Sequence, residues 1–341
     1  MIKKQVPGSF VSVDVSRRTR KSKFFHQIST VIDWSVFEKE LYKICKRSIV
    51  DAAGRPAYNP LVLFKMMLLQ TWYNLSDMGV EDMVNETLPA NAFCGLRVED
   101  TVPDHSTLSR FRSELVEKKA MHRLLAKLNA QLAHQGILVQ QGSILDASIT
   151  PTSRKPHGKT TYKLPEHPDT PPTKEVKPGV DKEAAWVKKG GKLHYGYKRH
   201  YLSEEETGLV IAVHTTSANV HDGQCIEACL DQVALPAGSR LLADKGYCSA
   251  KNEQLLRQRG LRSGIQRKAC RNKPLTVWEK RYNKRIGRSR YKIERVFGSI
   301  KRWFGRLEAK YVGMAKTHGQ HILEAIAYNL YRLPGIILSK A

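Results

Sequence analysis

The chain has 341 residues, of which 57 are Lys or Arg and 32 are Asp or Glu, so its formal net charge is +25. Apolar residues make up 41% of it, enough to bury the cores of two ordinary domains, which excludes a globally disordered chain. The longest apolar run, Leu61 to Trp72, is interrupted by Lys65 and is too short for a membrane span.

Residues 1–25 are predicted to form a basic arm. The first residues contain two lysines, but Pro, Gly, Ser and Asp follow where a signal peptide has an apolar core, so we expect a soluble cytoplasmic protein. Arg17, Arg18, Arg20, Lys21 and Lys23 come next with little apolar periodicity. Such a segment is expected to become ordered only on a partner.

Residues 26–138 are predicted to be all-α. Apolar residues recur at helical spacing, first around Trp34 and Phe37 and again from Leu61 onward. The pair Asn59-Pro60 is typical of a helix start, and a further helix is expected from about Val80 to Glu86.

The segment 103–112 opens another predicted helix, with Asp104 or Ser106 as its N-cap. Two helices ahead of a start rich in Ser, Thr and Arg would suit a helix-turn-helix, with Arg110 and Arg112 near DNA. The same spacing equally fits a core stripe with both arginines in solvent. The sequence leaves both interpretations open.

Beyond Gly136 the pattern changes to strands. Strands are predicted at 142–149, 192–202, 209–216, 240–244 and 263–266, and helices at 223–233, 250–259 and 277–304. Residues 151–178 hold 7 of the 15 prolines, so a long Pro-rich loop is expected, extending to about residue 190. The order predicts an α/β domain over residues 139–337.

The positive charge is concentrated late in the chain. Residues 251–310 contain 20 Lys or Arg and 4 Asp or Glu, which accounts for 16 of the 25 net charges. A solvated basic face would explain the excess, but so local a concentration favours a polyanionic partner, most commonly DNA or RNA.

Three acids stand out against this basic background. Asp146 lies inside a predicted strand, Asp244 ends another strand, and Glu294 lies on the basic helix. An acid within a strand is unfavourable for packing unless its carboxylate makes a polar interaction. A turn would explain Asp244, and an ion pair with Arg290 would explain Glu294. Two aspartates and a glutamate could instead hold two Mg²⁺ ions for phosphodiester cleavage or transfer. By contrast, His221, Cys225 and Cys229 lack the paired spacing usual for zinc.

These acids lie in runs that resemble bacterial insertion-sequence DDE transposases, in the group of the fourth and fifth insertion-sequence families and most like the fifth. The matching runs, in order, are GRPAYNPLVLFKMMLLQTWYNLSD (54–77), PDHSTLSRFR (103–112), LDASIT (145–150), DKEAAWVKKGGKLHYGYKRHY (181–201), TSANVHD (216–222), ADKGY (243–247) and IERVFGSIKRWFG (293–305). They extend across nearly the whole chain.

The resemblance implies an α/β fold class: a ribonuclease-H-like catalytic domain, with a mixed sheet flanked by helices, preceded by an all-α N-terminal DNA-binding region. On this pattern Asp146, Asp244 and Glu294 form the catalytic, metal-binding triad. The cofactor would be two Mg²⁺ ions, for which Mn²⁺ could substitute.

The family signature around its Glu is Tyr, two residues, Arg, three residues, Glu, six residues, Lys. Arg290, Glu294 and Lys301 fit it, whereas Gly287 stands at the Tyr position. Arg290 and Lys301 are expected to contact DNA phosphates near the scissile bond. Further expected DNA contacts are Lys198, His200 and Lys245, beside Arg110 and Arg112 of the helical region.

The implied function is that of a transposase that binds the terminal inverted repeats of its element, cuts DNA with Mg²⁺ and joins the 3′-hydroxyl ends to target DNA. The implied partners are double-stranded DNA and further copies of the chain, as a homodimer or larger synaptic assembly. The location would be the bacterial cytoplasm, near the nucleoid. Two alternatives are another metal nuclease on the same fold and a non-catalytic DNA-binding repressor.

Overall fold

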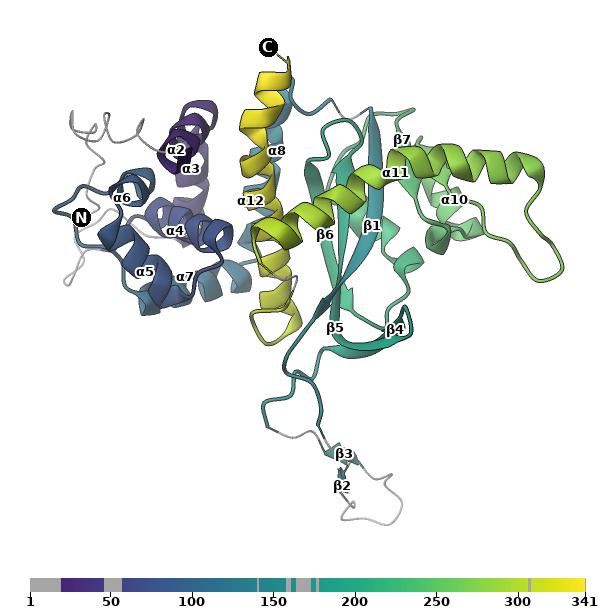
Figure 1. Cartoon of the computed structure of the whole chain (residues 1–341), viewed down its shortest axis with the longest axis horizontal. Helices are drawn as coiled ribbons and strands as arrows, with labels where there is room; N and C mark the ends of the chain where they lie inside the picture. The colour runs from purple at the N-terminus through teal and green to yellow at the C-terminus, as the bar shows by residue number, and fades with distance from the viewer. Residues whose placement is uncertain are drawn as a thin grey trace.

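A computed structural model describes residues 20–45, 57–139, 141–157, 161–163, 173–175, 178–305 and 308–340. Residues 1–19 of the predicted basic arm lie outside this range. Residues 20–25 differ from the prediction, because helix α2 (Arg20–Val31) already begins at Arg20 (Figure 1). Phe25 anchors this helix: it is buried and stacks on Phe93, with ring centroids 4.8 Å apart.

The first part of the chain is helical, as predicted. The helices after α2 are α3 (Trp34–Cys45), α4 (Pro60–Tyr73), α5 (Asp77–Glu86), α6 (Leu88–Cys94), α7 (His105–Glu117) and α8 (Ala120–His134). Helix α4 starts where expected, since Asn59 Oδ1 accepts a hydrogen bond of 2.8 Å from the Leu61 amide and Pro60 occupies the first helical position.

Helix α4 is the centre of this region and is buried on all sides from Pro60 to Trp72. The burial includes Lys65, whose ammonium lies 4.8 Å from the Trp34 ring centroid, and burial lowers the pKa of Lys65 to about 8. The apolar run noted in the sequence is therefore a core helix. Over the ranges described, the structure contains no helix with the length and apolar character needed to cross a membrane.

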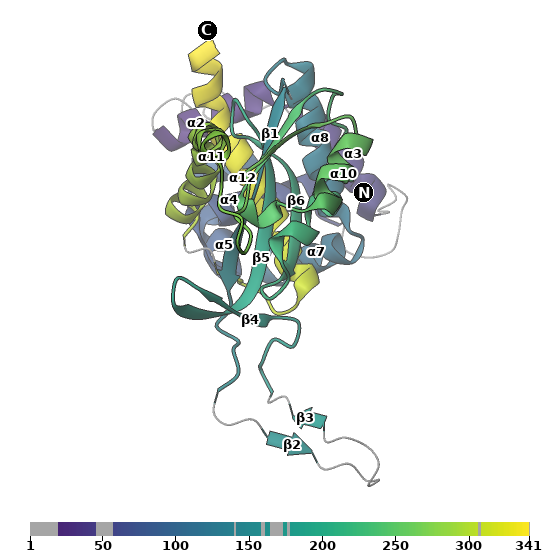
Figure 2. The ribbon, with the colours of Figure 1, turned by 90° about the vertical axis from the view of Figure 1, so that its right-hand side faces the viewer.

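The second part of the chain builds a mixed sheet (Figure 2). Its strands are β1 (Gly142–Pro151), β4 (Ala185–Lys189), β5 (Lys192–Glu204), β6 (Val210–Ser217), β7 (Arg240–Ala243) and β8 (Arg262–Ile265). The order is β4-β5-β1-β7-β8, and β6 also pairs with β5. Strand β1 is antiparallel to β5 and parallel to β7, which is parallel to β8.

Strand β5 passes very close to β1 at Gly196. A Cβ atom there would lie 2.2 Å from the carbonyl oxygen of Thr150, so only glycine fits. Before this point β5 pairs with β4, and after it with β6. Strand β4 was not predicted, because its side chains are largely exposed and lack apolar alternation.

In the predicted Pro-rich loop, residues 158–160, 164–172 and 176–177 lie outside the described residues, and its last part forms β4 instead of a loop. Within it the structure has a short antiparallel pair, β2 (Thr161–Lys163) with β3 (Thr173–Glu175), which lies away from the main sheet (Figure 2).

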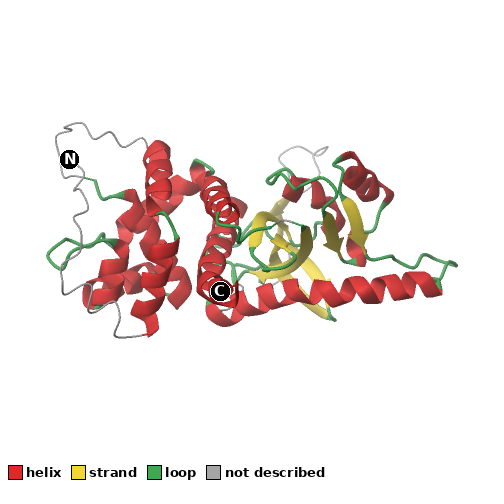
Figure 3. Ribbon diagram, turned by 90° about the horizontal axis from the view of Figure 1, so that it is seen from above, coloured by secondary structure: helices red, strands yellow, loops and turns green. Residues whose placement is uncertain are grey.

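Helices cover the sheet on both sides. They are the 3₁₀ turns η1 (Asp222–Gln224) and η2 (Lys245–Tyr247) and the α-helices α9 (Ile226–Leu230), α10 (Ala250–Gln258), α11 (Val277–Trp303) and α12 (Met314–Lys340). The helix predicted at 223–233 is thus divided between η1 and α9. Helices α10 and α11 lie on opposite faces of the sheet, and the first turns of α11 project beyond it (Figure 3).

Helix α12 is an element that the sequence pattern did not predict. It lies between the helical region and the sheet (Figure 1), and residues 321–330 are buried throughout. A helix buried all round shows no one-sided apolar period. The Trp72 indole donates to the Ala327 carbonyl at 2.9 Å, and Asn329 exchanges hydrogen bonds with Val210. One hydrophobic core therefore continues through both predicted domains.

An ion pair between Arg199 of β5 and Glu324 of α12 is buried in this core. Arg199 Nε also donates to Thr150 Oγ1 at 2.9 Å, and Gln320 donates to the other oxygen of Glu324 at 2.7 Å. The pair fixes α12 to the middle of the sheet.

Replacing Glu324 by Gln should lower the free energy of unfolding by about 3–5 kcal/mol, because the Arg199 guanidinium stays buried without its counter-charge. Urea denaturation of the full chain measures this. The matched variant Glu206→Gln, in an exposed turn, should change stability by no more than about 0.5 kcal/mol. Equal effects of the two variants would show that the buried pair does not stabilise the fold.

Candidate active site

The sheet places Asp146 and Asp244 side by side. The parallel strands β1 and β7 pair Leu145 with Ala243. Asp146 directly follows Leu145, and Asp244 directly follows Ala243. Strand β7 ends at Ala243, and Asp244 then caps η2 by accepting a hydrogen bond of 2.6 Å from the Lys245 amide. Two residues about 100 positions apart are thus brought together by strand register alone.

The two carboxylates differ in exposure. The side chain of Asp146 is 20% exposed and that of Asp244 is 41% exposed. Burial raises the pKa of Asp146, the negative charge of Asp244 adds to the rise, and the Arg290 guanidinium opposes it. Holding both acids ionised therefore requires a cation close by.

Arg290 is that cation in the structure. It lies on the buried face of α11, where Nη2 is 2.8 Å from Asp146 Oδ2 and Nη1 is 3.8 Å from Asp244 Oδ1. Its side chain is only 11% exposed. The sequence predicted a phosphate contact for Arg290, and the structure instead pairs it with both aspartates.

Glu294 lies one turn further along α11 and is exposed. The structure therefore joins two members of the predicted triad and places the third on the helix that crosses them. Among the residues described, no group of three or more His, Cys, Asp or Glu side chains is arranged to hold a metal ion. The assignment of Glu294 as a metal ligand remains a prediction.

The donor set fits a hard divalent cation at the aspartate pair. Carboxylate oxygens are the ligands Mg²⁺ prefers, and Arg290 shows that this pair accepts a positive charge. The neighbouring Tyr247 hydroxyl is buried and finds no hydrogen-bond partner in the described part of the chain. Burial raises the pKa of Tyr247 well above its usual value, and the charge of Asp146 raises it further.

Two residues of β5 that were predicted to contact DNA, His200 and Lys198, contact other residues of the protein in this structure. His200 is fully buried and lies 3.0 Å from Thr216 Oγ1, and burial lowers the pKa of His200 to about 3, so the ring is neutral. The protein encloses the ring in this structure, and the contact of His200 with DNA stays a prediction. Lys198 donates to Asp222 at 2.8 Å and to the Val220 carbonyl at 2.7 Å, which holds its ammonium near η1.

The two arginines of α7 have opposite environments. Asp104 caps this helix, as predicted, by accepting a hydrogen bond of 2.7 Å from the Thr107 amide. Arg110 is exposed, so it can reach a partner. Arg112 is buried and paired with Asp77, and its contact with DNA stays a prediction.

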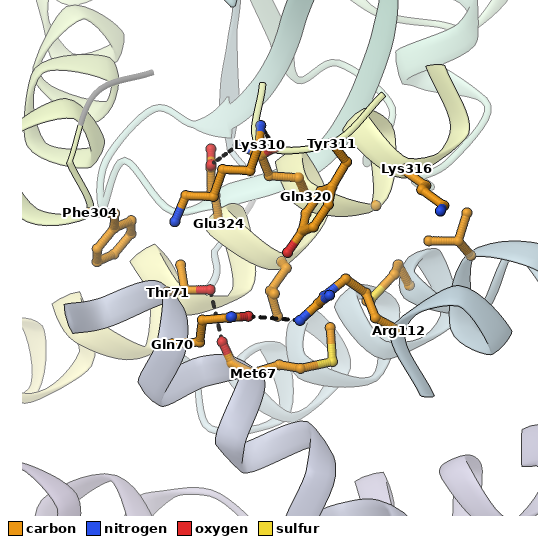
Figure 4. Close-up of a pocket in the computed structure, with 14 residues that line it drawn as sticks. Met67, Gln70, Thr71, Arg112, Phe304, Lys310, Tyr311, Lys316, Gln320 and Glu324 are labelled. Carbon is orange, nitrogen blue, oxygen red and sulfur yellow. Dashed lines mark hydrogen bonds between the residues drawn. The ribbon is translucent and has the colours of Figure 1, made fainter. Parts of the chain in front are cut away.

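Arg112 belongs to the pocket between α4, α7 and α12 (Figure 4). It donates to Gln70 Oε1 at 3.1 Å, and its guanidinium lies 4.9 Å from the ring centroid of Tyr311. These contacts join the helical region to the segment ahead of α12. In this structure Arg112 therefore contributes to the packing between these elements.

The exposed cations lie elsewhere. Lys245 and Lys301 are exposed, as a DNA contact requires. Sequence reasoning did not single out the exposed cations on the first half of α11, which are Lys280, Arg281, Lys284, Arg285 and Arg288. The sequence could have indicated these exposed cations. Ile286, Arg290 and Ile293 recur at helical spacing on the buried face of α11, and the exposed cations fall at the positions between them.

Comparisons with known proteins show which family the chain resembles. The family model "Transposase DDE domain" matches residues 138–330, and "Transposase domain (DUF772)" matches residues 13–114. The "Transposase for insertion sequence element IS1106" of Neisseria meningitidis serogroup B is 33% identical over 253 residues, covering 73% of this chain and 85% of the relative. A cryo-EM structure of the piggyBac transposase synaptic complex with hairpin DNA aligns over 96% of this chain and 77% of that chain, with 12% identity and a TM-score of 0.41.

Arg112→Met should lower the free energy of unfolding by about 3–5 kcal/mol, because Asp77 would lose its buried partner. Arg110→Met is the matched control on the same helix and should change stability by no more than about 0.5 kcal/mol. Thermal and urea unfolding of both variants give the comparison. An Arg112→Met protein as stable as the wild type would show that this arginine is not needed for the fold.

Proposed function

Because the chain belongs to the DDE transposase family of bacterial insertion sequences, we propose that it binds the terminal inverted repeats of its element, cleaves them by divalent-metal-dependent hydrolysis, and transfers the 3′-hydroxyl ends to target DNA. The observation that carries the proposal is that Asp146 and Asp244 directly follow the last paired residues of β1 and β7, Leu145 and Ala243, and contact the same arginine. Both acids lie within the residues that match the DDE domain.

Asp146 and Asp244 are proposed to hold Mg²⁺, with Mn²⁺ as a substitute, and Glu294 is proposed as a third ligand from α11. Bound there, two divalent ions supply an activated water or 3′-hydroxyl and stabilise the departing oxygen. The register of β1 and β7 keeps the aspartates adjacent, so they need little rearrangement to share a cation.

The exposed face of α11 is the proposed DNA surface of the catalytic region. Lys280, Lys284 and Lys301 would neutralise phosphates and release their counterions. Trp278 lies among these cations, is 62% exposed and stacks on Tyr282, so it offers an aromatic face to a base. Arg110 and Lys245 are the other exposed members of the predicted contact set.

Joining two ends to one target requires both ends in one complex. We therefore infer a homodimer or larger assembly on DNA. Light scattering of the protein with and without end-containing duplex gives the stoichiometry.

The triad variants Asp146→Asn, Asp244→Asn and Glu294→Gln should each reduce nicking of an end-containing duplex at least about a thousandfold, because a metal ligand is lost. Electrophoresis of labelled duplex in Mg²⁺, Mn²⁺ or EDTA measures nicking, and anisotropy in EDTA should show end binding nearly unchanged. Asp231→Asn, an exposed acid after α9, is the matched control and should cut normally.

Two outcomes would contradict the proposal. Nicking without strand-transfer products would indicate another nuclease on this fold. Metal-independent function in all three variants would indicate a DNA-binding repressor.

The double variant Lys280→Gln/Lys284→Gln should weaken DNA binding and lower the slope of log K against log salt by about 1.8, the value for two lost phosphate contacts. Anisotropy between about 50 and 200 mM salt measures this slope. Lys251→Gln/Arg257→Gln on α10 removes the same charge from the other face of the sheet and should leave the slope nearly unchanged. Equal slopes for the two double variants would exclude α11 as the contact surface.

A further inference from the structure

The Arg290 guanidinium lies where a metal-binding pair of aspartates would place its cation. It touches Asp146 at 2.8 Å and Asp244 at 3.8 Å from the same side chain. We propose that Arg290 substitutes for the metal in the free protein and leaves the aspartates when DNA phosphate offers it a new partner. DNA binding and divalent-metal binding are then positively coupled. The inference rests on the proposed function and adds to it how metal binding is regulated.

The charges require such an exchange. Two adjacent carboxylates, one of them largely buried, repel each other unless a cation lies between them. Arg290 supplies one positive charge. A divalent ion bound to the same oxygens would add two more within a few ångströms of the guanidinium, in a poorly solvated place where repulsion is strong. The same carboxylates therefore do not hold both cations well.

The Arg290 guanidinium also makes fewer hydrogen bonds in this position than it has donors for. Its Nε is buried and has no hydrogen-bond partner among the described residues, although a guanidinium has five donors. An unmet buried donor is costly, so the pairing with the aspartates is not the best arrangement for this side chain. A phosphate would accept two parallel hydrogen bonds from it.

The surroundings favour phosphate as that new partner. Exposed cations of α11 lie within the two turns before Arg290, at Lys284, Arg285 and Arg288. A DNA backbone attracted by them would pass the position of Arg290 on the helix. Once Arg290 turns to the phosphate, Asp146 and Asp244 are free for the metal. By linkage, bound metal then strengthens DNA binding by the same factor.

The test measures Mn²⁺ binding to the full chain by electron paramagnetic resonance, with no DNA present and without reference to activity. Arg290→Gln should bind Mn²⁺ at least about tenfold more tightly than the wild type. This factor is typical of the coupling free energy between two binding sites. Arg295→Gln, an exposed arginine on the same helix, removes the same net charge and should change Mn²⁺ affinity less than about twofold. Circular dichroism confirms that both variants are folded.

A second measurement tests the coupling directly. Adding end-containing duplex, with samples frozen before cleavage, should raise the Mn²⁺ affinity of the wild type and leave that of Arg290→Gln nearly unchanged. Equal Mn²⁺ affinities of wild type and Arg290→Gln without DNA would overturn the inference, as would weaker binding by the variant. In that case Arg290 only positions the aspartates.

The Asp146→Asn background separates this inference from the proposed function. If it abolishes Mn²⁺ binding in wild type and Arg290→Gln alike, the aspartates are the site and the comparison of arginine variants is decisive. If Mn²⁺ binding in both proteins does not depend on Asp146, the proposed metal site itself fails, and this inference fails with it.

Discussion

The parallel register of β1 and β7 is the constraint on which the candidate site depends. It sets Asp146 beside Asp244, and two neighbouring carboxylates need a positive partner. Helix α11 crosses the sheet so that Arg290 meets that need from the buried face, while its other cations stay exposed. A basic helix over an acidic pair therefore supplies the counter-charge for the aspartates as well as the proposed surface for DNA.

Helix α12 links the helical region to the sheet that carries the site. It is buried between the helical region and the sheet, with Trp72 bonded to its backbone on one side and Arg199 paired with Glu324 on the other. One core runs through both parts of the chain, so the helical region and the aspartates belong to one packed unit. If the helical region binds DNA, as the sequence predicts, that DNA lies against the same unit that carries the aspartates.

Much of the fold was predictable because local sequence patterns indicate where many of its helices and strands lie. Strands β1, β5 and β6 and helices α4 and α11 lie close to the predicted ranges, since alternation, periodicity and N-caps are local properties. Helix α12 was not predicted because burial on all sides removes its period, and β4 was not because exposed edge residues lack alternation. Strands β2 and β3 were not predicted, because three residues each are too few to show an alternation of apolar and polar residues.

From the sequence alone the candidate site could be predicted as two aspartates, a glutamate on a basic helix, and an excess of cations around it. Which of these cations are exposed and which are paired follows from the fold. Arg112 pairs with Asp77, 35 residues away, and Arg290 pairs with Asp146, 144 residues away, while Arg110 and Lys301 face solvent. Neighbouring residues show a charge, but burial and ion pairing depend on partners that only folding brings close.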